Sequence, residues 1–138
     1  RAPQAARPAA APEGEEAAPA WVMTLIVRNI PCRASLWQLK QVIDGLGFGR
    51  RYDLLYLVQV PSEVGEAVPN RGYGFINFPA VADAWAFMEA YEGYRFEGTN
   101  SQKRGTAEPA NIQGVSACLR HIRATTRGRS AGSLFATI

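Results

Sequence analysis

The octapeptide RGYGFINF, residues 71–78, limits the possible fold more than any other stretch of this chain. Read as a strand, it points successive side chains to opposite faces. One face is small and apolar and can pack against helices, with Gly72, Gly74, Ile76 and Phe78. The other face sets two aromatic rings between a cation and an amide, in the order Arg71, Tyr73, Phe75 and Asn77. Such a face suits a flat, anionic ligand better than it suits water.

Hydrophobic periodicity predicts further elements on both sides of the octapeptide. Alternating patterns predict strands over Met23–Ile30, over Tyr52–Val60 and near Gly105–Ala110. Apolar residues at helical spacing predict helices after Ser35, near Val81 and near Val115. At the first of these helices, Ser35 and Gln38 form the pattern of a capping box.

The order of these elements predicts an α+β fold. Strand, helix, strand, strand, helix, strand is the ferredoxin-like β-α-β-β-α-β arrangement. Two helices then cover one face of a four-stranded antiparallel sheet, and an extra C-terminal helix follows. Since Ile76 and Phe78 suit the helix-covered face, we expect Tyr73 and Phe75 on the open one.

Composition divides the chain into three parts. Residues 1–20 are rich in alanine and proline and hold no aromatic or β-branched side chain, so we expect a disordered linker. Residues 21–125 hold the predicted domain with its added helix, and residues 126–138 are expected to form a basic flexible tail. Because the first residue is Arg rather than Met, we expect the chain to be a piece of a longer protein.

Charge and cysteine content narrow the class of protein. The 138 residues carry a formal charge of +3, which is compatible with a polyanionic ligand. Cys32 and Cys118 lie far apart without CxxC spacing, which fits a reducing compartment and argues against a disulfide framework. No apolar run reaches the roughly 18–20 residues of a membrane span. We therefore expect an intracellular protein, in the nucleus, the cytoplasm or both, that does not enter a membrane.

The octapeptide matches the RNP1 pattern K/R-G-F/Y-G/A-F-V-x-F/Y of RNA recognition motifs, with Ile76 in place of valine. The chain therefore resembles this family, which implies the ferredoxin-like fold and RNA binding. The segment LIVRNI, residues 25–30, takes the RNP2 position on the neighbouring strand. It departs from the usual pattern because Ile26 stands where an aromatic side chain commonly stacks a base.

Within that family the chain is similar to the C-terminal RNA recognition motif of Mei-two-like proteins. The similarity rests on the spacing of VRNIPCRASLWQL, YDLLYLVQV, RGYGFINF, TNSQK and NIQGVSACLRHI. It spans roughly residues 22–124 and implies single-stranded RNA as the partner, with no small-molecule cofactor. At family level it also implies roles in meiosis and development, and we expect post-transcriptional or developmental and meiotic regulation.

The RNP1 strand and its neighbour supply most of the expected RNA contacts. Tyr73 and Phe75 can each stack a base or a ribose. Arg71 can pair with a phosphate, and Asn77 can bond a base edge. On the first strand, Ile26 offers an apolar contact and Arg28 points the same way.

Two further groups of contacts depend on phase and on charge. If Leu55 and Leu57 face the core, then Tyr52, Leu54 and Tyr56 face the RNA, although the opposite phase would also bury leucines. On the third helix, Arg120 and Arg123 form a basic patch that could follow an RNA backbone. The alternative for that patch is an ordinary solvated helix face.

The sequence leaves two alternatives to RNA binding on an open sheet and gives no sign of catalysis. His121 is the only histidine, and no grouping of side chains suggests a catalytic or a metal site, so we do not expect an enzyme. The main alternative is a protein-interaction domain that uses the sheet or the third helix. A third possibility is self-masking, in which Val115, Leu119 and Ile122 pack on the face that carries Tyr73 and Phe75.

Overall fold

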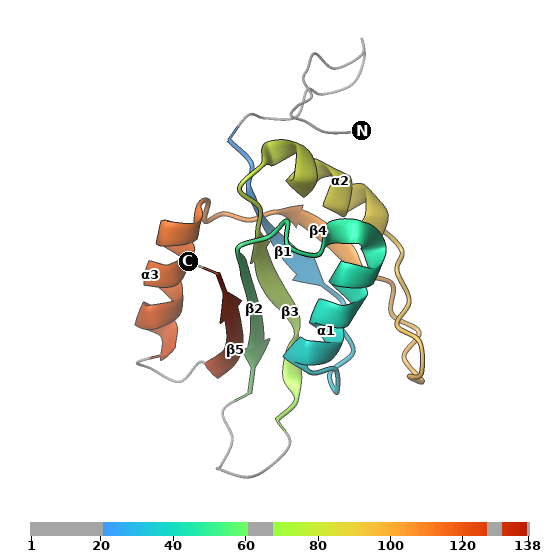
Figure 1. Ribbon diagram of the computed structural model, residues 1–138. Helices are drawn as coiled ribbons and strands as arrows, with labels where there is room; N and C mark the ends of the chain where they lie inside the picture. The colour runs from blue at the N-terminus through green and yellow to red at the C-terminus, as the bar shows by residue number, and fades with distance from the viewer. Residues whose placement is uncertain (1–20, 61–67, 127–130, 138) are drawn as a thin grey trace.

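The computed structural model describes residues 21–60, 68–126 and 131–137, which form one antiparallel sheet with helices on both sides (Figure 1). The strand order across the sheet is β4-β1-β3-β2-β5, with every neighbouring pair antiparallel. The strands are β1 (Thr24–Arg28), β2 (Leu54–Gln59), β3 (Asn70–Asn77), β4 (Thr106–Pro109) and β5 (Ala131–Ala136). The predicted β-α-β-β-α-β order is confirmed, and a fifth strand extends it.

Two helices cover one face of the sheet, as expected. They are α1 (Leu36–Ile43), which continues into the short π-helical segment η1 (Asp44–Phe48), and α2 (Val81–Tyr91). The predicted capping box is present at the start of α1. The Gln38 backbone N–H donates to Ser35 Oγ at 3.1 Å, and the Ser35 N–H donates to Gln38 Oε1 at 2.8 Å. The cap satisfies donors that the first helical turn leaves unpaired.

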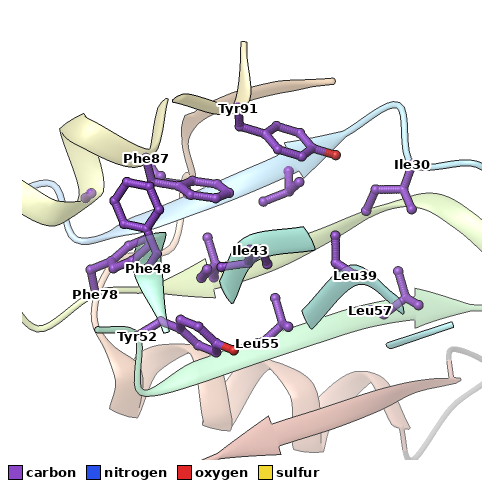
Figure 2. Close-up of a cluster of buried hydrophobic side chains, with 14 of the residues drawn as sticks. Ile30, Leu39, Ile43, Phe48, Tyr52, Leu55, Leu57, Phe78, Phe87 and Tyr91 are labelled. Atoms are coloured by element: carbon purple, nitrogen blue, oxygen red, sulfur yellow. The ribbon is translucent and has the colours of Figure 1, made fainter. Parts of the chain in front are cut away.

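The main core lies between the sheet and these two helices (Figure 2). Leu55 and Leu57 are fully buried in it, which confirms the predicted phase of β2. The expectation that Tyr52 faces the RNA together with Tyr56 is wrong. Tyr52 precedes the first residue of β2, joins the main core at 3% exposure, and donates from its hydroxyl to Asp44 Oδ1 at 2.8 Å.

The expectation of a flexible tail is wrong for residues 131–136, whereas residues 127–130 and 138, like the expected linker over residues 1–20, lie outside the described residues. Ala131–Ala136 form β5, which pairs along the whole of β2. Phe135 packs against the main core, with its ring centroid 5.9 Å from that of Tyr52. The segment AGSLFA carries no strong strand pattern, so its order comes from pairing with β2 rather than from local preference.

The third helix, α3 (Val115–Thr126), lies on the side of the sheet away from α1 and α2 (Figure 1). Within the part of the chain that the structure describes, no helix has the length and apolar character needed to cross a membrane.

Candidate RNA-binding face

The strand register aligns side chains in rows across the face opposite the main core. Phe75 of β3 lies between Ile26 of β1 and Tyr56 of β2. The same row ends at Glu108 of β4 on one side and at Leu134 of β5 on the other. The next row places Tyr73 opposite Arg28. The register therefore brings Tyr73 and Phe75 together with Ile26, Arg28 and Tyr56, and it adds Glu108, which strand alternation alone does not indicate.

Helix α3 covers the β2 side of this face. A second buried cluster joins the helix to the sheet; its members are Leu54, Tyr56, Val58, Cys118 and Ile122. Tyr73, Phe75, Val115 and Leu119 pack against it while remaining partly exposed. The helix stripe thus packs where the self-masking hypothesis required, but it leaves the two RNP1 rings half-buried rather than hidden.

Tyr56 occupies the predicted face but is closed off by the helix. It is 3% exposed, and its hydroxyl is buried with no hydrogen-bond partner among the described residues. Burial raises the pKa of this phenol, with a smaller contribution from Tyr73. Its ring lies over Gly132 of β5, where an added Cβ would overlap the ring and the Leu57 carbonyl. The expectation that Tyr56 offers a free stacking platform is therefore wrong in this arrangement.

A hydrogen-bonded network holds the beginning of α3 against β1. Gln113 Oε1 accepts from the backbone N–H groups of Met23 and Thr24 at 2.8 and 2.9 Å. Gln113 Nε2 donates to the carbonyl oxygens of Thr24 and Ala110 at 2.8 and 2.9 Å. The Gly114 N–H donates to Thr24 Oγ1 at 2.8 Å. Hydrogen bonds between side chains and backbone therefore fix the residues that precede α3 to the beginning of β1.

Asn77 belongs to the same network, so its expected role at a base edge is wrong here. Its side chain is 1% exposed. Its Oδ1 accepts from Thr24 Oγ1 at 2.6 Å, and its Nδ2 donates to Asp53 Oδ1 at 2.9 Å. Sequence alternation placed Asn77 on the correct face, but it could not reveal that the start of α3 covers this end of β3.

The uncovered half of the face carries five side chains, which we call the open platform: Ile26, Arg28, Tyr73, Phe75 and Glu108. The Tyr73 and Phe75 rings meet edge to face, with centroids 6.0 Å apart. Arg28 Nε lies 3.2 Å from Glu108 Oε2, and the two side chains are 50% and 56% exposed. The platform therefore combines two aromatic rings, an apolar side chain and an exposed ion pair.

The remaining expected contacts lie outside the open platform, on β3 and α3. Arg71 is exposed near the start of β3. Arg120 and Arg123 are exposed on α3, and between them His121 places its ring 6.5 Å from that of Phe75. His121 therefore lies where α3 meets the platform, whereas Arg120 and Arg123, one and two positions away, lie on other sides of the helix.

Among the described residues, no group of three or more His, Cys, Asp or Glu side chains could hold a metal ion. Cys32 is exposed, and Cys118 is buried in the cluster under α3. Burial raises the pKa of the Cys118 thiol, which works against a reactive thiolate.

Three features define an RNA recognition motif. They are the four-stranded core of the sheet, the two helices that cover one face, and the aromatic side chains of the RNP1 strand on the opposite face. The chain belongs to the RNA recognition motif 2 family, whose model matches residues 22–123. It is therefore an RNA-binding module.

Relatives agree with the family assignment, and a solved structure is similar in fold. Protein MEI2-like 5 of Oryza sativa subsp. japonica is 34% identical over 100 residues, which are 72% of this chain and 12% of that protein. Protein MEI2-like 1 of Arabidopsis thaliana is 35% identical over 100 residues, which are 72% of this chain and 10% of that protein. The Rna15 RNA recognition motif with bound RNA (GU) is similar at a TM-score of 0.51 and 14% identity, covering 71% of this chain and 94% of that one. That likeness shows the fold alone.

Proposed function

We propose that this chain binds short stretches of single-stranded RNA on the open platform. The observation that carries the proposal is the pair of half-exposed rings, Tyr73 and Phe75, beside Ile26 and Arg28 on a face that α3 covers only in part. Unstacked bases present flat apolar surfaces that such rings can stack, at roughly 1–3 kcal/mol per base.

The proposed contacts divide by chemistry. Tyr73 and Phe75 stack successive bases or riboses, and Ile26 adds an apolar contact where the family pattern usually has a ring. Arg71 at one margin, with Arg120 and Arg123 on α3, supplies positive charge for phosphates. Tyr56 and Asn77 act indirectly. Tyr56 belongs to the buried cluster against which Phe75 packs, and Asn77 bonds Thr24 in the network that fixes the start of α3.

The wider role is proposed by resemblance. We propose a non-catalytic module that works inside the cell, in the nucleus, the cytoplasm or both, in post-transcriptional regulation of meiosis or development. The chain spans only 10–12% of the length of the MEI2-like relatives reported above, so the functions of those whole proteins enter only as part of this proposal.

A protein-interaction domain is the second candidate, and one observation favours it. A groove of about 960 Å³ lies on the other side of the molecule, lined by α1, η1 and the segment between α2 and β4, including Val42, Leu46, Tyr94 and Phe96. Docking through the apolar stripe of α3 is disfavoured, because that stripe already packs on the sheet. The groove and the open platform share no residue, so variants can separate the two functions.

The test is fluorescence anisotropy with short single-stranded RNAs at two salt concentrations. Tyr73→Ala/Phe75→Ala should weaken binding by at least about tenfold, since each ring stacks a base. Trp37→Ala is the matched control, because Trp37 is an aromatic side chain that is 63% exposed on α1, away from the platform. Binding that survives loss of both rings, or that falls equally with Trp37→Ala, would overturn the proposal.

A further inference from the structure

We infer that the Arg28–Glu108 pair makes the open platform select guanine over the other RNA bases. The inference rests on the proposed function, because it concerns the base that stacks on this platform.

Glu108 occupies an unusual position for a surface that binds a polyanion. It lies in the row of Phe75 and Ile26, on the strand directly beyond Ile26. Neighbouring strands are about 4.8 Å apart, so a base stacked over Phe75 and Ile26 brings one edge above β4. A carboxylate repels phosphate, and this geometry therefore directs Glu108 to the base edge.

Guanine is the base whose edge matches a carboxylate with two oxygens. Its Watson–Crick edge places the N1–H and N2–H donors side by side, so both carboxylate oxygens can accept. Uracil offers one donor on that edge, at N3, and cytosine and adenine each offer one exocyclic amino group. An ionised acceptor forms stronger hydrogen bonds than a neutral one, so the second donor separates guanine from the rest.

Arg28 completes the match. Its Nε lies 3.2 Å from Glu108 Oε2, which holds the guanidinium beside the carboxylate. Beyond its N1–H, the guanine edge presents the O6 acceptor, which the remaining guanidinium N–H groups can reach from beside Glu108. Both side chains are at least half exposed, and an exposed ion pair adds little stability. Both side chains can therefore shift to bond a base, even if the contact between them lengthens, without a large loss of folding stability.

The experiment compares four uridine heptamers that differ only at the central base: uridine, guanosine, inosine or 7-deazaguanosine. Inosine lacks the N2 amino group, whereas 7-deazaguanosine keeps the whole Watson–Crick edge. We expect guanosine and 7-deazaguanosine to bind equally, and both to bind about tenfold more tightly than inosine or uridine, because one charged hydrogen bond is lost. Equal affinity for guanosine and inosine would overturn the inference.

Variants assign the preference to Glu108. Glu108→Gln should bring the ratio of guanosine to uridine affinity close to one, even if loss of a negative charge raises affinity for every heptamer. Glu92→Gln is the control, because Glu92 is an exposed carboxylate that follows α2 on the opposite side of the sheet, and it should keep the ratio. Retention of the ratio in Glu108→Gln would overturn the inference.

Failure of this inference is distinguishable from failure of the proposed function. If all four heptamers bind equally and Tyr73→Ala/Phe75→Ala weakens them all, the RNA-binding platform stands and the guanine preference falls. If no heptamer binds, or if the double variant binds as well as the wild type, the proposed function fails and the preference fails with it.

Discussion

The side chain of Gln113 bonds the backbone of Thr24 in both directions, although the two residues are 89 positions apart in the chain. Gln113 Oε1 accepts from the Thr24 N–H at 2.9 Å, and Gln113 Nε2 donates to the Thr24 carbonyl at 2.8 Å. These two bonds satisfy the N–H and the carbonyl of Thr24 at the beginning of β1, and they hold the residues before α3 against this strand.

Gln113→Ala should lower the free energy of unfolding by about 2 kcal/mol, because it leaves partly buried backbone groups of Met23, Thr24 and Ala110 without these partners. Chemical denaturation measures the loss, and hydrogen exchange should show weaker protection in the first turn of α3. Gln102→Ala, at an exposed position outside the helices and strands, is the control. Unchanged exchange in the first turn would contradict a bridging role for Gln113.

Gly74→Ala should destabilise the sheet by about 3 kcal/mol or more. A Cβ at this position would overlap the carbonyl oxygen of Tyr56 on β2, near the irregular register between Leu57 and Gln59. Gly45→Ala is the matched control, since a Cβ there meets no atom within 4 Å. Similar melting temperatures for the two variants would show that the strands separate without cost.

Phe135→Ala should cost about 1–2 kcal/mol, because the ring covers the margin of the main core beside Tyr52 and lies 4.8 Å from Lys40 Nζ. The neighbouring variant Leu134→Ala removes a side chain that is 44% exposed and should change stability by less than about 0.5 kcal/mol. Urea titration compares the two. Equal losses would mean that β5 contributes through its backbone pairing alone.

Stability should fall in alkaline solution through Tyr52. Burial, followed by the hydrogen bond to Asp44, raises the pKa of this phenol above its ordinary value of 10.0. The folded state therefore retains a proton that the unfolded chain releases near pH 10, and the stabilisation present below that pH is lost as pH rises further. Urea denaturation at a series of pH values measures the slope. Tyr52→Phe should flatten it, and an unchanged slope would assign the effect to other groups.

Local patterns in the sequence predicted those parts of the site that depend on strand alternation. Tyr73 and Phe75 share a face because they are two positions apart, and the apolar run of β2 forces Tyr56 onto that face once Leu55 and Leu57 enter the core. The capping box at Ser35 is likewise a contact between residues three positions apart. Each of these relationships lies within a few residues.

The parts that the sequence did not predict depend on pairings between distant segments. β5 has weak preferences of its own and forms by pairing with β2. Asn77 is buried because Thr24 and Asp53 reach it from other elements. Glu108 enters the open platform through its register with Ile26. The alternation of side chains along a strand predicts which face a residue takes, but it does not predict which residue of another strand lies beside it.

The fifth strand has a consequence for how far α3 can travel. The helix is fastened at its beginning by Gln113, and only residues 127–130 separate its last residue, Thr126, from β5. Because α3 is attached at both ends, it cannot rotate off the sheet as a helix attached at one end would. Release would require β5 to peel away from β2 or the Gln113 bridge to break. While both attachments hold, Tyr56 stays withdrawn from the surface, and α3 leaves uncovered only the part of the sheet face on the β1 and β4 side.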